Sequence, residues 1–186
     1  MIRLPAAIER QATIMFRREK VFSARGNSLK GDIKFVSFRA NEHRGDRQAG
    51  SLAMKKTKIE FSSHTGNLAL MRNCVRRFLE NFPFSERQRT LMVLGVDEAC
   101  TNIIRHAYQL RDDQPISLCL EGRNGTVCVR LRDYGRKAKP DAMKSRPADL
   151  IKPGGLGLHL IRTAFDQVDY VLRSRGTELV LTKNLE

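Results

Sequence analysis

The chain has 186 residues, 41% of them hydrophobic, which is enough to bury the core of one domain and leave an additional segment. No run of about 18 apolar residues occurs, which argues against a transmembrane helix, and the first residues lack the apolar stretch of a secretory signal. The net charge of +14 allows a nucleic-acid partner, but the basic residues are scattered, so direct nucleic-acid binding is disfavoured and an acidic protein partner explains the charge as well.

The two ends of the chain differ in character. Residues 1–53 are irregular and basic, and neither a helical nor a strand period persists in them. Met54 opens a regular pattern that continues to the end of the chain. We therefore expect one folded domain at 54–186, preceded by an extension that is disordered or that reflects a misassigned start site.

From Met54 onward the hydrophobic period switches between the helical and the strand value. Pro83 ends the first helical stretch, and Ser85 followed by Gln88 has the capping-box spacing of a second helix. Asn124-Gly125 is a strong type I′ hairpin signal. The predicted elements are a strand at 58–62, helices at 67–81 and 85–108, strands at 116–121 and 127–131, a helix at 156–165, and strands at 168–173 and 177–183.

This order of elements predicts the fold class. Two helices follow the first strand, and a third helix separates two pairs of strands. The expectation is an α+β fold, an α/β sandwich with its helices packed on one face of a mixed, mainly antiparallel sheet. Residues 136–154 form a long, charged, proline-containing loop between the second pair of strands and the third helix.

The cysteines show neither a metal-binding nor a disulfide pattern. None forms a CxxC pair, and each lies in an apolar-patterned stretch. We expect buried free thiols in a reducing cytoplasm. The four residues are Cys74, Cys100, Cys119 and Cys128.

Three polar residues of the second predicted helix are spaced by four. Glu98, Asn102 and His106 therefore project from one helical face. Glu98 could accept a proton from an attacking hydroxyl, and the amide oxygen of Asn102 could ligate magnesium. His106 could contact phosphate or hold the helix end. A solvated polar face explains the same spacing, so the triplet by itself leaves both interpretations open.

Two turns at strand ends carry further candidates. Asp133 could accept a hydrogen bond from an adenine amino group, and Gly135 permits a tight turn with close approach of a ligand. Thr177, which follows Gly176, could donate its hydroxyl to the base or to a bound water. An ordinary Asp-containing turn and an ordinary hairpin account for these residues equally well in isolation.

A glycine cluster directly precedes the third predicted helix. Gly154 and Gly155 are followed by Leu156, Gly157 and Leu158. Exposed backbone N–H groups and the positive end of a helix suit polyphosphate, although a flexible hinge with a helix cap is the alternative. The spacing matches neither GxxxxGK[ST] nor a strand-borne GxGxxG, so P-loop and Rossmann sites are excluded.

These signals occur in the order of the four sequence boxes of the GHKL, or Bergerat-fold, histidine-kinase-like ATPases, which the chain resembles over roughly 55–186. Within that group, EACTNIIRHAY at 98–108 resembles the EAxTNxxxHAY element of anti-sigma-factor serine kinases. GLGLHLI at 155–161 resembles their GLGLxLI element, and the segments at 165–168 and 176–183 match the closing pattern.

The resemblance implies a role for each matching residue. Glu98 becomes the general base, Asn102 the magnesium ligand within an ATP site, and His106 part of that site. Asp133 becomes the adenine contact and Gly135 the turn beneath the base, with 136–154 as a lid over ATP. The remaining implied ATP-binding residues are Gly155, Leu156, Gly157, Leu158 and Thr177.

By the same resemblance the domain is expected to be a cytoplasmic, magnesium- and ATP-dependent protein serine/threonine kinase. It would act as an anti-sigma factor in transcription regulation, phosphorylating a STAS-type anti-anti-sigma protein, sequestering a sigma factor, and forming a homodimer. Two alternatives remain: a nucleotide-binding anti-sigma module without kinase activity, and the ATPase fragment of a histidine kinase. The module without kinase activity stays open because the sequence departs from the family pattern at one point: Gly135 is followed by Arg136-Lys137 where the family commonly has a second glycine.

Overall fold

The computed structural model describes residues 34–40, 55–123, 125–137 and 156–185. The strands are β1 (Lys34–Ala40), β2 (Lys55–Ser62), β3 (Pro115–Arg123), β4 (Thr126–Arg132), β5 (Gln167–Leu172) and β6 (Thr177–Asn184). The helices are α2 (Asn67–Leu79), α3 (Glu86–Asn102), the π-helical turn η1 (Ile103–Ala107) and α5 (Leu156–Ala164).

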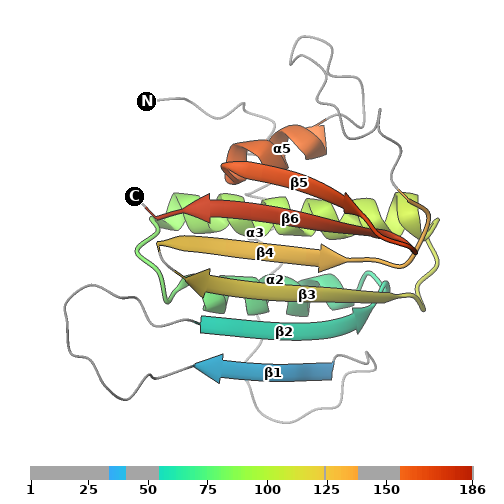
Figure 1. Ribbon diagram of the computed structural model, residues 1–186, viewed down its shortest axis with the longest axis horizontal. Helices are drawn as coiled ribbons and strands as arrows, with labels where there is room; N and C mark the ends of the chain where they lie inside the picture. Colours follow the sequence, from blue (N-terminus) through green and yellow to red (C-terminus); the bar gives the residue numbers. More distant parts are fainter. Residues whose placement is uncertain (1–33, 41–54, 124, 138–155, 186) are drawn as a thin grey trace. The chain divides into compact units, whose positions relative to one another are not determined.

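The strands form one six-stranded sheet in the order β1-β2-β3-β4-β6-β5 (Figure 1). Each pairing is antiparallel, with Leu120 opposite Val129 between β3 and β4, and Val129 opposite Leu181 between β4 and β6. The α+β class is confirmed. The described strands show no parallel pair, whereas the sequence predicted a mixed sheet.

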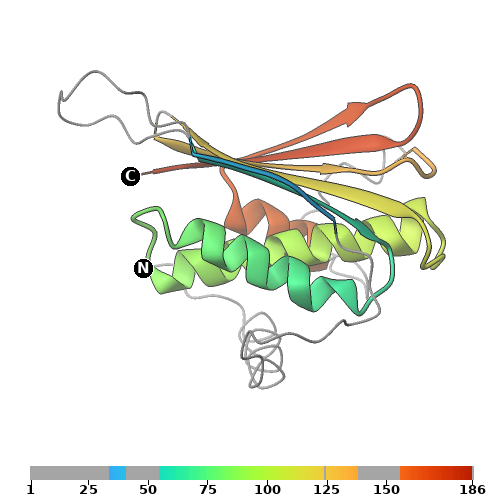
Figure 2. The same ribbon diagram turned by 90° about the horizontal axis from the view of Figure 1, so that it is seen from below.

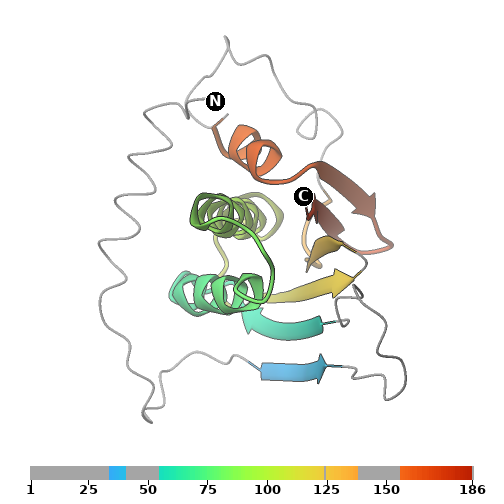
Figure 3. The ribbon, with the colours of Figure 1, turned by 90° about the vertical axis from the view of Figure 1, so that its left-hand side faces the viewer.

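The helices α2, α3 and α5 lie on one face of the sheet, as Figures 2 and 3 show from two directions. Alternate strand residues point toward them, and Ile59, Leu118 and Leu181 are fully buried there. On the helix side Met71 and Ile161 are fully buried as well. Each such side chain contributes about 1.5–3 kcal/mol by leaving water, so this shared interior holds the two layers together.

Strand β1 lies in the region for which the sequence predicted no regular element. It pairs with β2 from Lys34 opposite Glu60 to Ala40 opposite Lys55, with an irregularity between Phe35 and Ser37. An edge strand gains its order from backbone hydrogen bonds to one neighbour, and hydrophobic period does not reveal such a partner. The rest of 1–53 lies outside the described residues.

The capping box at the start of α3 is confirmed. Gln88 N donates to Ser85 Oγ at 3.3 Å, and Ser85 N donates to Gln88 Oε1 at 2.8 Å. Farther along α3, a Cβ on Gly95 would lie 3.1 Å from Ala164 Cβ and 3.2 Å from the Phe165 ring, so α3 and α5 pack with little space between them. Among the helices in the described part of the chain, none is long and apolar enough to cross a membrane.

Candidate functional site

Glu98 lies on α3, half-buried against the first turn of α5. A Cβ on Gly157 would overlap the Glu98 carboxyl group and would stand 2.6 Å from its Cγ. Burial raises the pKa of Glu98, an effect that Arg105 and His106 oppose and Asp97 reinforces. The Glu98 carboxyl group therefore lies beside the N-terminal end of α5, with a pKa that burial holds above its ordinary value.

The helix that carries Glu98 does not continue as an α-helix to Tyr108. The α-helical part ends at Asn102, and the next turn is π-helical, closed by a 3.0 Å hydrogen bond from Tyr108 N to Ile103 O. Glu98 and half-buried Asn102 keep their four-residue spacing on one face. His106 lies in the wider π turn and is exposed, and its charge acts on the Glu98 carboxyl group, so one face shared by all three residues remains a prediction.

Asp133 follows β4 and is buried, with 4% of its surface exposed. Its Oδ1 accepts a 2.9 Å hydrogen bond from Gly135 N, and its own N–H donates to Thr177 O at 3.0 Å. Burial raises the pKa of Asp133, while the backbone N–H groups of Gly135 and Thr177 and the charge of Arg132 lower it. Two residues that are far apart in sequence, Asp133 and Thr177, are thus brought together, and both are buried.

Gly135 is crowded by protein atoms. A Cβ there would overlap the Ala107 carbonyl group and lie 2.8 Å from Tyr108 Cδ1. The next residue, Arg136, donates its N–H to Ala107 O at 3.0 Å. The sequence attributed this glycine to close approach of a ligand, but in the structure it lets the turn after β4 pack against η1.

Tyr108 is a site residue to which the sequence assigned no role. Its hydroxyl accepts from Tyr134 N at 2.9 Å and donates to Pro115 O, which fixes the turn after β4 from the helix side. Burial raises the pKa of Tyr108 to about 12. The sequence feature that could have identified Tyr108 as a site residue is its position directly after His106 and Ala107 in the helix motif.

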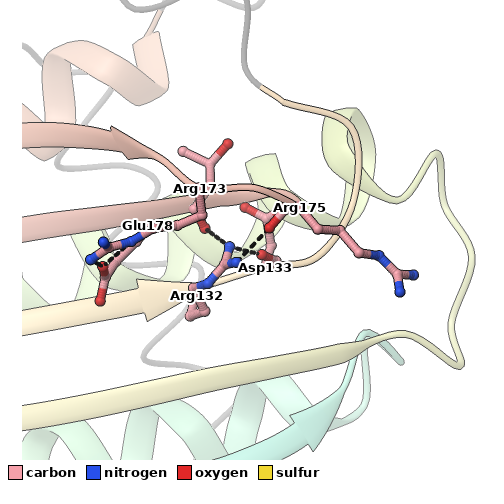
Figure 4. A network of polar contacts seen from close by, with 6 residues as sticks. Arg132, Asp133, Arg173, Arg175 and Glu178 are labelled. Atoms are coloured by element: carbon pink, nitrogen blue, oxygen red, sulfur yellow. Dashed lines mark hydrogen bonds and ion pairs between the residues drawn. The ribbon is translucent and has the colours of Figure 1, made fainter.

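A second set of contacts holds the same turn from the sheet side (Figure 4). Arg132 donates to the carbonyl oxygens of Asp133, Thr177 and Arg175. Arg175 Nε in turn donates to Tyr134 O at 3.1 Å. The turn after β4 and the turn between β5 and β6 therefore form one hydrogen-bonded unit, which the sequence pattern did not reveal.

The glycine cluster is only partly described. Gly155 lies outside the described residues, and Leu156 begins α5. Gly157 contacts the Glu98 carboxyl group, and Leu158 is half-buried. The predicted lid at 136–154 lies outside the described residues except for Arg136 and Lys137, which are exposed.

The segment from Glu98 to Ala107 spans two contacts. Glu98 meets the start of α5, and Ala107 meets the turn that carries Asp133. The two points lie at different heights along the continuous helix of α3 and η1, on the order of 10 Å apart. Such a layout suits an elongated ligand with a hydrogen-bond donor at the Asp133 end and negative charge at the α5 end.

Asn102 lies between these two ends and supplies an amide oxygen. In the described residues no group of three or more His, Cys, Asp or Glu side chains could hold a metal ion. A magnesium ion bound largely by phosphate oxygens and water needs only one or two protein ligands. The half-buried Asn102 amide is compatible with that role.

The fold is that of a histidine kinase-like ATPase domain. Residues 61–183 match the family described as histidine kinase-like ATPase domain, and the chain belongs to that family. It is similar to the serine-protein kinase RsbW of Bacillus mycoides (strain KBAB4), with 25% identity over 140 residues that cover 71% of this chain and 86% of the relative. A serine-protein kinase RsbW of Halalkalibacterium halodurans is 34% identical over 101 residues, covering 50% of this chain and 60% of the relative.

Replacing Tyr108 with Phe should destabilise the domain, because it leaves the Tyr134 N–H and the Pro115 carbonyl without their hydrogen-bond partner. We expect the free energy of unfolding to fall by about 1–3 kcal/mol in urea denaturation. Tyr170→Phe is the matched control, since burial raises the pKa of Tyr170 but its hydroxyl makes no hydrogen bond to the described residues. Equal losses in the two variants would contradict the assignment.

The contact between Gly157 and Glu98 can be measured by a double-mutant cycle. Gly157→Ala should cost about 1–3 kcal/mol of unfolding free energy by forcing the Glu98 side chain aside. In a Glu98→Ala background the same change should be neutral or stabilising, because alanine favours the helix over glycine by about 1 kcal/mol. Additive effects of the two substitutions would show that the Glu98 side chain does not contact the backbone at Gly157.

Proposed function

We propose that this protein is an ATP-dependent protein serine/threonine kinase that acts as an anti-sigma factor. The observation that carries the proposal is the Glu98 carboxyl group packed against Gly157 at the start of α5. The half-buried Glu98 carboxylate lies beside the start of the helix at which the family's polyphosphate end is expected. Family membership and the similarity to serine-protein kinases support the same conclusion.

The base of ATP would bind at the opposite end. Asp133 is a buried hydrogen-bond acceptor at that end, and an adenine amino group is a donor of matching polarity. Thr177 is buried beside it and would contact the base or a water bound to it. Gly135 would shape the turn beneath the base through its packing on Ala107.

The phosphates would lie along α3 toward α5. Backbone N–H groups at Gly155, Leu156, Gly157 and Leu158 would bind them, together with the positive end of the helix. Exposed His106 would reach the phosphates from the π turn. Asn102 would hold magnesium, which when bound offsets the negative charge on the phosphate oxygens.

Glu98 would act as the general base. Its carboxylate would take the proton of the substrate serine hydroxyl as that oxygen attacks the γ-phosphate, and ADP would leave with the bridging oxygen. Burial raises its pKa, which makes it a better proton acceptor than an exposed glutamate. Most of the acceleration would come from alignment of the two reactants and from electrostatics.

The resemblance to anti-sigma serine kinases suggests the partners. The substrate would be a STAS-type anti-anti-sigma protein in the cytoplasm, and the sequestered partner would be a sigma factor bound by a homodimer. The net charge of +14 suits acidic partner surfaces. Incubation with labelled ATP, magnesium and purified STAS proteins tests the transfer, and acid-stable phosphoserine separates this function from a histidine kinase, which gives acid-labile phosphohistidine.

Replacing Glu98 with Gln should lower phosphotransfer by about 10²–10⁴-fold while ATP affinity stays near the wild-type value, because the base is lost and the shape is kept. In the wild type, transfer should decline as pH falls through the raised pKa of Glu98, and the variant should lack this acid limb. Glu80→Gln, at an exposed glutamate after α2, is the control. Unchanged transfer in Glu98→Gln would remove Glu98 from the mechanism, and ATP binding without any transfer by the wild type would favour a nucleotide-binding module.

Replacing Asp133 with Ala should weaken ATP binding by about 1–3 kcal/mol through loss of one buried polar contact. Isothermal titration calorimetry measures the change directly. Asp169→Ala, at an exposed aspartate of β5, should bind ATP like the wild type. Wild-type affinity in Asp133→Ala would refute the adenine contact.

A further inference from the structure

Arg132 is the last residue of β4 and directly precedes Asp133 (Figure 4). Its Nη1 donates to the carbonyl oxygen of Asp133 and, at 3.0 Å, to that of Thr177, while its Nη2 donates to the carbonyl oxygen of Arg175. The guanidinium carbon also lies 4.5 Å from the centre of the Tyr134 ring. One cation therefore contacts the backbone of both turns that carry the proposed base-binding residues.

A neighbouring arginine shows how specific this arrangement is. Arg130 occupies the same strand and the same face of the sheet, two residues earlier. Its Nη1 lies 3.1 Å from Glu121 Oε2, so its charge is matched by a carboxylate in an ordinary cross-strand ion pair. The partners of Arg132 are backbone carbonyl groups and an aromatic ring, which suits a planar cation that holds main chain in place.

We propose that Arg132 is a positioning residue for base recognition, tying the turn of Asp133 to the turn of Thr177 so that the Asp133 carboxylate is held for adenine. The inference rests on the proposed function. Adenine presents its N6 amino group as a donor, whereas guanine presents its O6 as an acceptor. A carboxylate held opposite this position of the base therefore favours adenine and disfavours guanine, whereas a loosened carboxylate can reach the N2 amino donor of guanine and loses that distinction.

The geometry explains why lysine is not an equivalent residue here. A guanidinium has five N–H donors in a rigid plane, which allows it to reach three carbonyl groups and lie over the Tyr134 ring at once. An ammonium group is a compact charge on a flexible stem and does not reproduce that planar fork. Arg132→Lys keeps the charge and removes the fork, so it separates the two contributions.

The test is calorimetric titration of wild type, Arg132→Ala, Arg132→Lys and Arg130→Ala with ATP and with GTP, with thermal unfolding recorded on the same samples. We expect Arg132→Ala to bind ATP about tenfold more weakly while GTP binding changes little, so that the ratio of the two affinities falls by the same factor. Arg132→Lys should show a reduced ratio as well. Arg130→Ala should keep the wild-type ratio.

The outcomes separate the two proposals. A wild-type protein that binds no ATP overturns the proposed function and this inference with it. ATP binding by the wild type together with an unchanged ratio in both Arg132 variants overturns the positioning role alone. An equal loss of affinity for ATP and for GTP in the Arg132 variants also overturns the positioning role, because it indicates a structural role only. If Arg132→Ala fails to fold, the ratio in Arg132→Lys decides.

Discussion

The site depends on the contact between the end of the long helix and the turn that follows β4. Ala107 accepts a 3.0 Å hydrogen bond from Arg136 N, and Gly135 packs against the same carbonyl group with no room for a side chain. Tyr108 adds a 2.9 Å hydrogen bond from Tyr134 N. These interactions join the helical layer to the sheet at the point where Asp133 must be placed.

The two candidate carboxyl groups, Glu98 on α3 and Asp133 after β4, have different surroundings. Near α5, the Glu98 carboxyl group is half-buried with cationic groups nearby, and burial is the larger influence on its pKa, which it raises. Near the β4 turn, burial raises the pKa of Asp133 as well, but backbone N–H groups oppose that rise by stabilising the charged form. The first arrangement suits a group that accepts a proton, and the second suits a group that remains a hydrogen-bond acceptor. This difference in surroundings is consistent with one carboxylate for proton transfer and another for base recognition.

The backbone at this end of the molecule is tightly constrained. Gln109 and Leu110, just after η1, have φ values of 54° and 64°, in the left-handed region that residues with a Cβ seldom occupy. Leu110 N donates to Ile104 O at 2.8 Å, which helps to hold that conformation. Gly176, with φ of 71°, allows the opposite turn to approach the Asp133 main chain without a side chain between them. Conformations of this kind persist where surrounding contacts over-determine them, and they are concentrated at functional sites.

The sequence alone determined most of the elements, the α+β class, the capping box at Ser85, and the residues Glu98, Asn102, Asp133 and Thr177 as candidates. These features are local, since hydrophobic period, cap spacing and turn residues are read within a few positions. Only the tertiary structure decided the edge strand β1, the π turn that follows Asn102, and the partners of Gly135, Tyr108 and Arg132. Each of these depends on atoms from segments far apart in the chain, as when Arg132 binds the Thr177 carbonyl. No periodicity encodes which distant backbone a side chain will reach.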